Sequence, residues 1–136
     1  MARVKGAVLT PRDRILISYL AIARYASTLQ LHRLVADGRD ISLMYRRLRR
    51  LSADVNRPGE APCMRRLEFK RAEGTALAVW TLTQYGRAQA EDSVHYLRPP
   101  GRADVGAQFL LHTLMLNDVL VELVLWLRRS PESPLA

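Results

Sequence analysis

The apolar residues near the start of the chain follow a helical pattern. Thr10, Pro11 and Asp13 combine a capping hydroxyl, a proline suited to the first helical position and an acid that can reach back to the cap. We therefore expect a helix over about residues 11–25. Its apolar positions recur at three- and four-residue spacing and form one face for a core: Ile15, Leu16, Tyr19, Leu20 and Ala23.

A short helix and a tight turn are expected next. Ser27 and Gln30 form a second capping box, apolar residues at helical spacing continue to Val35, and Gly38 closes the helix. Residues 37–40 then form a four-residue turn that contains glycine. This length and composition are typical of the turn in a helix-turn-helix motif.

The helix after this turn is predicted over residues 41–57, with Asp40 as its cap and with Pro58 and Gly59 at its end. One apolar stripe runs along it at positions i, i+3, i+7, i+10 and i+14: Ile41, Met44, Leu48, Leu51 and Val55. Because this stripe faces the core, the opposite side of the helix should point to solvent.

Two short extended runs, residues 65–71 and 77–82, alternate apolar and polar positions across a loop that contains Gly74, which predicts a β-hairpin. A hairpin directly after a helix-turn-helix is a wing. The fold class we expect is mostly α with a small β-hairpin wing, a winged helix-turn-helix plus a long C-terminal helix.

A helix-turn-helix with a wing is typical of DNA-binding domains, and we expect this winged-helix DNA-binding domain to span residues 1–97. Thr83 should cap a helix over about residues 84–93. The rest of the chain is predicted as a proline-containing linker at 98–104, a long helix at 105–129 and a frayed tail at 130–136.

Positive charge is concentrated in the first part of the chain. Residues 1–75 hold 16 Lys and Arg against 7 Asp and Glu, whereas residues 76–136 hold 5 against 6. Such a distribution is typical of a nucleic-acid-binding protein, although an anionic membrane or an acidic protein could use the same charge. Only Lys5 and Lys70 are lysines. Arginine favours planar contacts to phosphate or guanine, and the codon usage of a GC-rich genome explains the same preference.

The outward face of residues 41–57 contains the candidates for DNA contact. Residues near the helix start should meet base edges: Ser42, Leu43 and Arg46, with Arg46 suited to a guanine and Leu43 to a thymine methyl group. The full predicted set is Ser42, Leu43, Tyr45, Arg46, Arg47, Arg49 and Arg50 on the helix and Arg65, Arg66, Lys70 and Arg71 on the hairpin. An arginine-rich helix face is also typical of an ordinary solvated surface.

The C-terminal helix is apolar around most of its girth, so it must be buried on more than one side. Its length raises the question of a membrane span, but Asn117, Asp118 and Glu122 lie at its centre, where each charge is costly in a bilayer. We therefore expect no membrane contact. One side carries Phe109, Leu116, Val119, Leu123 and Trp126. The other side is the one we assign to a homodimer interface: Leu110, Leu114, Asn117, Val121, Val124 and Leu125. The alternative is that the helix packs entirely within its own subunit.

We find no constellation for catalysis or metal binding. His32, His95 and His112 lie far apart in the sequence, and no glycine-rich phosphate loop or nucleophile motif is visible. Asp118 and Glu122 lie four residues apart and could pair for acid–base chemistry, but such a pair is also typical of a solvated stripe. We expect a protein that is not an enzyme and has no cofactor and no metal.

The single cysteine, Cys63, excludes an internal disulfide and a cysteine-cluster metal site. The start of the chain has no apolar run of signal-peptide length. These features favour a cytoplasmic protein.

Several segments resemble one known family. They are LTPRDR at 9–14, LQLHRLV at 29–35, RRLRRL at 46–51, WTLTQYGRA at 80–88 and FLLHTLMLNDVLVEL at 109–123. Together these segments, over about residues 8–123, resemble the N-terminal part of the bacterial replication-relaxation family, winged-helix proteins associated with plasmid replication and DNA relaxation. The combination of His112, Thr113, Asn117 and Asp118 is its most specific part. The resemblance implies DNA binding. Because longer members continue with a further domain, it does not extend to a relaxation activity.

Two functions fit these observations. The first is a homodimeric transcriptional or plasmid replication regulator that binds a specific, pseudo-palindromic site in double-stranded DNA. The second is an interaction or scaffold protein whose C-terminal helix docks a larger replication or mobilisation partner.

Overall fold

The computed structural model of the protein describes residues 6–36, 38–52, 58–70, 74, 76–90 and 105–129. The elements are α1 (Pro11–Ala23), β1 (Ala26–Ser27), α2 (Thr28–Ala36), α3 (Ile41–Leu51), β2 (Met64–Lys70), β3 (Ala76–Leu82), α4 (Gln84–Gln89) and α5 (Ala107–Arg129). The strands form one antiparallel sheet in the order β1-β3-β2. The predicted winged helix-turn-helix with a long C-terminal helix is confirmed. The predicted linker at 98–104 and tail at 130–136 lie outside the described residues.

The predicted caps of α1 and α2 are confirmed. The Thr10 amide donates to Asp13 Oδ2 at 2.8 Å, and the Asp13 amide donates to Thr10 Oγ1 at 3.2 Å. Ser27 and Gln30 form the same reciprocal pair, at 3.1 and 3.2 Å. The first helix ends at Ala23 rather than near residue 25, because Arg24 turns the chain at φ 71°. Residues 26 and 27 then pair with β3 as the short strand β1, which the sequence pattern did not predict.

The second helix of the helix-turn-helix, α3, ends earlier than expected. Asp40 caps α3 as predicted, but α3 ends at Leu51, and Ser52 has an extended backbone that bridges to Met64. The Cys63 amide donates to the Leu51 carbonyl at 2.8 Å, so the chain entering β2 satisfies the open end of the helix. Residues 53–57, which include Val55, lie outside the described residues.

Trp80 is the centre of the core between the helices and the sheet. Its side chain is completely buried, and its Nε1 donates to Thr28 Oγ1 at 2.9 Å. The predicted stripe of α3 packs into this core through Met44, Leu48 and Leu51, whereas Ile41 at the start of the helix is 41% exposed. The burial of an indole with its N–H satisfied holds α3 against the sheet.

The helix α4 is short, and it packs closely against the chain that enters β2. Thr83 caps it as predicted and accepts from the Gly86 amide at 3.1 Å. The helix ends at Gln89; residues 91–93 of the expected helix lie outside the described part. A Cβ on Gly86 would lie 2.0 Å from the Cys63 carbonyl oxygen, so only glycine fits there.

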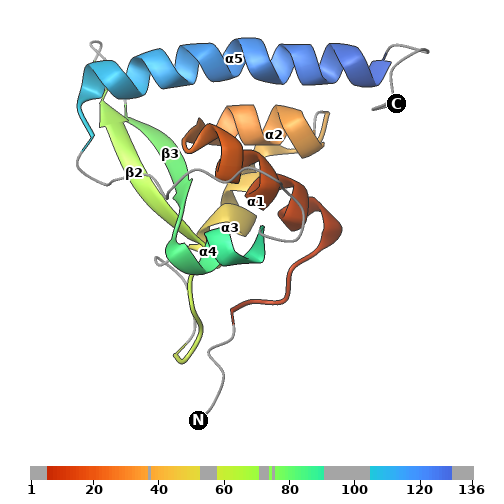
Figure 1. The fold of residues 1–136 in the computed structure, drawn as a ribbon, viewed down its shortest axis with the longest axis vertical. Helices are drawn as coiled ribbons and strands as arrows, with labels where there is room; N and C mark the ends of the chain where they lie inside the picture. The colour runs from red at the N-terminus through yellow and green to blue at the C-terminus, as the bar shows by residue number, and fades with distance from the viewer. Residues whose placement is uncertain are drawn as a thin grey trace.

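The long helix α5 lies across one side of the winged-helix unit, over α2 and one end of the hairpin (Figure 1). Leu110 and Leu114 pack there with Tyr25, Phe69 and Val79 in a second apolar cluster. The helix therefore covers one face of the hairpin and leaves α3 at a distance.

Candidate nucleic-acid interface

The solvent side of α3 consists of Ser42, Leu43, Arg46, Arg49 and Arg50, which we call the α3 outer face. Ser42, Leu43, Arg46 and Arg49 are exposed, and Leu43 is 57% exposed. The guanidinium groups of Arg46 and Arg49 have no hydrogen bond or ion pair within the part of the chain that the structure describes. These two charges are therefore available to an external anion.

The start of α3 is stabilised by its cap. The Ser42 amide and the Ser42 hydroxyl both donate to Asp40 Oδ1 at 2.9 Å. These two hydrogen bonds hold the pKa of the Asp40 carboxyl below its ordinary value. The Ser42 hydroxyl thus serves the cap, and it would have to rotate to reach a base.

Arg47, which the sequence predicts as a DNA contact, does not belong to the outer face. Its Nε donates to Asp13 Oδ1 at 3.0 Å, and its Nη2 donates to the same carboxylate and to the Val8 carbonyl, the latter at 2.9 Å. The Asp13 side chain is 2% exposed. Arg47 therefore fastens α3 to α1, and its partner lies 34 residues away in the sequence, where a local pattern does not reveal it.

Arg50 is partly engaged at the other end of α3. Its two terminal nitrogens donate to Glu60 at 2.9 and 3.0 Å, a two-pronged ion pair that raises the pKa of Arg50. The Arg50 side chain is still 25% exposed. A DNA phosphate would have to compete with Glu60 for this group.

A groove of about 500 Å³ separates the start of α3 from the hairpin. Ile41 and Tyr45 line one side and Arg66 and Glu68 the other. Tyr45 is half-buried, packs edge-on against Trp80 at 6.0 Å, and its hydroxyl accepts from Arg66 Nη1 at 2.9 Å. Tyr45 and Arg66 therefore form the floor of the groove between helix and wing.

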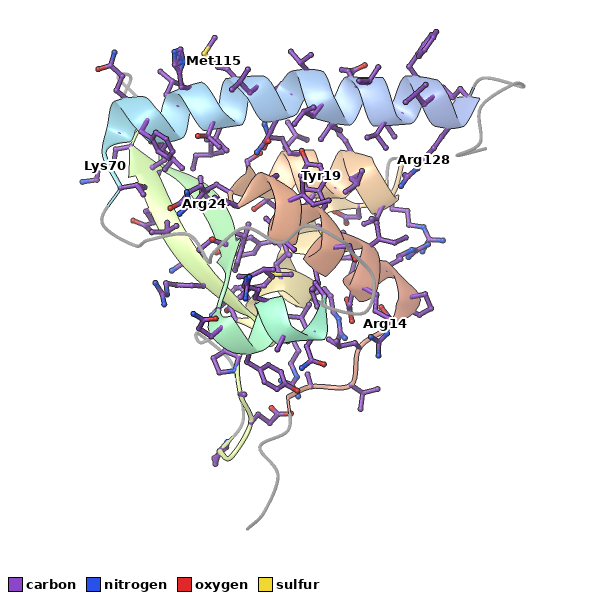
Figure 2. The ribbon with its side chains drawn as sticks, viewed as in Figure 1. Arg14, Tyr19, Arg24, Lys70, Met115 and Arg128 are labelled. Atoms are coloured by element: carbon purple, nitrogen blue, oxygen red, sulfur yellow. The ribbon has the colours of Figure 1, made fainter. Side chains whose placement is uncertain are left out.

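The other predicted hairpin residues are divided between the two faces of the sheet. Alternation along β2 places Lys70 on the same face as Arg66, toward α3. Lys70 is exposed at the end of the hairpin (Figure 2). Arg65 is exposed but lies on the opposite face, so it does not join the α3 outer face. Arg71 lies outside the described residues.

The side of α5 that we assigned to a dimer interface packs on its own chain, which corrects that prediction. Among the assigned residues, Val124 is half-buried and the others are buried in the subunit: Leu110, Leu114, Asn117, Val121 and Leu125. Both sides of the helix are apolar, so hydrophobicity did not reveal which side faces inward.

Polar contacts fix the position of this inner side. Gln30 Nε2 donates to the Leu114 carbonyl at 2.6 Å and to Asp118 Oδ1 at 2.7 Å. Asn117 Nδ2 donates to the Tyr25 carbonyl, so Asn117 sets the register of α5 on its own subunit.

The far end of α5 is held by two further contacts. Arg128 Nη1 donates to the Leu34 carbonyl at 2.7 Å (Figure 2). Glu122 pairs with Arg33 of α2. Because α2 is the first helix of the helix-turn-helix, these contacts attach α5 directly to that motif.

The opposite side of α5 is an exposed apolar surface, which we call the α5 outer side. Each of its large apolar residues is at least 45% exposed: Phe109, Leu111, Met115, Leu116, Val119, Leu120, Leu123 and Trp126. Met115 points away from the body of the molecule (Figure 2). By length and composition alone α5 could also cross a membrane. A soluble monomer seldom exposes such a continuous apolar surface, so this side is suited to a partner.

Within the described ranges, no group of three or more His, Cys, Asp or Glu side chains could hold a metal ion. His32 is buried, and its Nε2 lies 2.6 Å from the Arg39 carbonyl in the turn before α3. Cys63 is buried, and burial raises the pKa of its thiol to about 11. These two residues are therefore structural in this fold.

The family model of the replication-relaxation proteins matches residues 17–135. Neither the curated proteins nor the solved structures contain a significant match to the chain. The family match extends from α1 through α5 and so includes the α3 outer face and the whole of α5. The chain belongs to the replication-relaxation family.

Proposed function

We propose that the protein is a regulator that binds a specific site in double-stranded DNA and has no catalytic activity. The observation that carries the proposal concerns Arg46 and Arg49 on the exposed side of a well-packed helix. Their guanidinium groups have no hydrogen bond or ion pair with any described residue. A major groove about 12 Å wide admits one α-helix. The wing and its groove lie beside this helix, where they can follow the neighbouring backbone.

The residues of the α3 outer face divide by position into base and phosphate contacts. Leu43 and Arg46 lie near the start of α3, the part of a recognition helix that enters the groove most deeply. Arg46 is suited to two hydrogen bonds with a guanine, and Leu43 to a thymine methyl group. Arg49, one turn along from Arg46, and Lys70 on the wing are suited to phosphates.

The α5 outer side supports a homodimer. Positions 109, 112, 116, 119, 123 and 126 alternate three- and four-residue steps, the repeat of a helix that packs along another helix. In an antiparallel pair about a twofold axis near residue 117, Leu116 faces Val119 of the second copy and Phe109 faces Trp126. His112 then faces Leu123. The same surface meets itself, as a twofold dimer requires.

The size of the α5 outer side is also sufficient for a dimer. Its eight large apolar side chains are about half exposed, so a second copy can cover on the order of 800 Å² per partner. That is about the area of a standard stable interface. A dimer with two α3 helices would read two half-sites about one helical turn apart, roughly 34 Å.

Selection of bound sequences from a random duplex library tests DNA binding, and light scattering of the same sample tests the dimer. We expect one enriched palindromic site, a twofold mass and an affinity that falls steeply with salt. A library that shows no enrichment would contradict the proposal. The alternative is a docking protein whose α5 outer side binds a larger partner. It requires a monomer or an aggregate, without sequence selection, that becomes soluble when the partner is co-expressed.

A further inference from the structure

We propose that Arg12 and Arg39 together bind one phosphate-type oxyanion in a pocket beside α3. This site rests on the proposed DNA binding, because the position of the pocket favours a phosphate of the DNA backbone as its ligand. Neither arginine belongs to the α3 outer face or to the wing.

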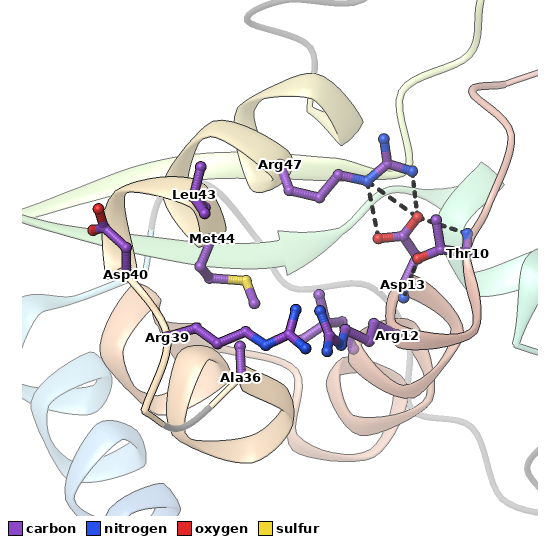
Figure 3. A pocket seen from close by; sticks show the side chains of 10 residues that line it. Thr10, Arg12, Asp13, Ala36, Arg39, Asp40, Leu43, Met44 and Arg47 are labelled. Atoms are coloured by element: carbon purple, nitrogen blue, oxygen red, sulfur yellow. Dashed lines mark hydrogen bonds and ion pairs between the residues drawn. The ribbon is translucent and has the colours of Figure 1, made fainter.

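The pocket has a volume of about 290 Å³ and lies between the start of α1, the end of α2 and the start of α3. Leu16, Ala36 and Met44 are buried residues that form its apolar floor. Arg12 comes from one side and Arg39 from the other, and Figure 3 shows their guanidinium groups pointing toward one another across it. Two planar donor groups therefore converge on one space.

Among the described residues, no acidic side chain that lines the pocket pairs with Arg12 or Arg39. Arg47 also lines the pocket, but its charge is balanced by the Asp13 carboxylate. The Asp40 carboxylate accepts from Ser42 and lies away from the two guanidinium groups (Figure 3). Within the described ranges, the guanidinium groups of Arg12 and Arg39 have no hydrogen bond or ion pair.

Two like charges that converge without a counterion repel each other, and an oxyanion between them converts this repulsion into two charge-assisted interactions. The volume lies at the lower limit of ligand pockets, which span roughly 300–1,000 Å³, so the pocket suits a sugar-phosphate unit better than a large ligand.

The position of the pocket favours a phosphate of the DNA strand. Leu43 of the α3 outer face lines its edge, and Arg39 lies in the turn that leads into α3. When α3 lies in the major groove, the DNA strand beside it would therefore pass the opening of the pocket. A free phosphate ion has the same chemistry and is distinguished by experiment.

The test uses Arg12→Gln, Arg39→Gln, the double variant and Arg14→Gln, whose exposed arginine on α1 does not line the pocket. DNA affinity is measured against salt. Each pocket variant should weaken binding about tenfold and lower the salt slope by about 1. The salt slope of the double variant should fall no further than that of either single variant, because both arginines hold the same phosphate. Arg14→Gln should retain the wild-type slope.

A second arm titrates the protein alone with inorganic phosphate against chloride at matched ionic strength and follows the arginine Nε signals by NMR. Shifts confined to Arg12 and Arg39 would identify a free oxyanion as the ligand, even where DNA binding fails altogether. Unchanged salt slopes together with unchanged NMR signals would overturn the proposal. A double variant whose salt slope falls by about twice as much as that of a single variant would overturn the proposal that the two arginines hold one phosphate.

Discussion

Asp13 at the start of α1 accepts hydrogen bonds from the Arg47 guanidinium of α3, with Nε 3.0 Å from Oδ1, while its Oδ2 accepts from the Thr10 amide at 2.8 Å. One buried carboxylate thus caps the first helix and fixes the position of α3. The arginine-rich sequence of α3 therefore contains two kinds of residue: Arg47 holds the helix in place, and Arg46 and Arg49 point outward from it.

Replacement of Arg47 should lower the stability of the protein, whereas replacement of the neighbouring Arg46 should not. Arg47→Met leaves the Asp13 carboxylate buried without its partner. We expect a loss of about 2 kcal/mol in the free energy of unfolding, below the ~3–5 kcal/mol of a fully buried pair because the Arg47 side chain is 34% exposed. Arg46→Met should stay within about 0.5 kcal/mol of the wild type. Urea unfolding measures both, and equal effects would contradict the division between the two arginines.

The stability of the protein should also depend on the ionisation of Asp13. Burial alone would raise the pKa of this carboxyl, but hydrogen bonds from Arg47 and Thr10 outweigh it and lower the pKa below its ordinary value of 3.8. The carboxylate therefore stabilises the folded state above about pH 4, and this contribution is lost as the pH falls through the folded-state pKa.

The matched variant for this titration is Asp13→Asn, which keeps a capping oxygen. It should be less stable than the wild type at pH 7, and the difference should shrink toward pH 2. Urea unfolding across this range measures it. A difference that stays constant down to pH 2 would show that Asp13 does not contribute through its charge.

Gly86 should tolerate no side chain. In Gly86→Ala the new Cβ would lie 2.0 Å from the Cys63 carbonyl oxygen, so backbone must move, and we expect a loss of about 1–3 kcal/mol. Gly106→Ala is the control, because a Cβ there has no heavy atom within 4 Å. Thermal unfolding of both variants compares them, and a Gly86→Ala protein as stable as the control would be inconsistent with this contact.

The antiparallel dimer of α5 can be tested by cross-linking. We expect His112→Cys and Leu123→Cys to form a disulfide-linked dimer when the two proteins are mixed, and each variant alone to form little. The native Cys63 is buried, so it adds little background. A parallel dimer would cross-link in each single variant. A protein that stays monomeric in all these samples would contradict the homodimer, and the α5 outer side would then bind another partner.

The local parts of the fold could be predicted from the sequence. The caps at Thr10 and Ser27 and the α3 stripe of Met44, Leu48 and Leu51 depend on residues within a few positions of one another. The strand β1 was missed because a segment of two residues, Ala26–Ser27, is too short for an alternating pattern and forms only through its pairing with β3.

The long-range parts of the candidate site could not be predicted. The Arg47 side chain turns inward because an acid from α1 lies beside it, and the Arg50 side chain meets Glu60 from the segment before β2. Hydrogen bonds between residues far apart in the sequence determine which side of α5 faces inward. Gln30 bonds to Leu114, and Tyr25 bonds to Asn117. Local charge and hydrophobicity predict the helices, but tertiary contacts determine which of their side chains face solvent.

The most direct measurement is the affinity of Arg46→Ala, Arg49→Ala and Arg14→Ala for the selected duplex, by fluorescence anisotropy over a range of salt. We expect Arg46→Ala to lose about tenfold or more and to relax the preference at one base pair. Arg49→Ala should bind all sequences more weakly, with a salt slope smaller by about 1. Arg14→Ala should bind as the wild type does. Wild-type affinity and slope in both α3 variants would contradict DNA binding through the α3 outer face.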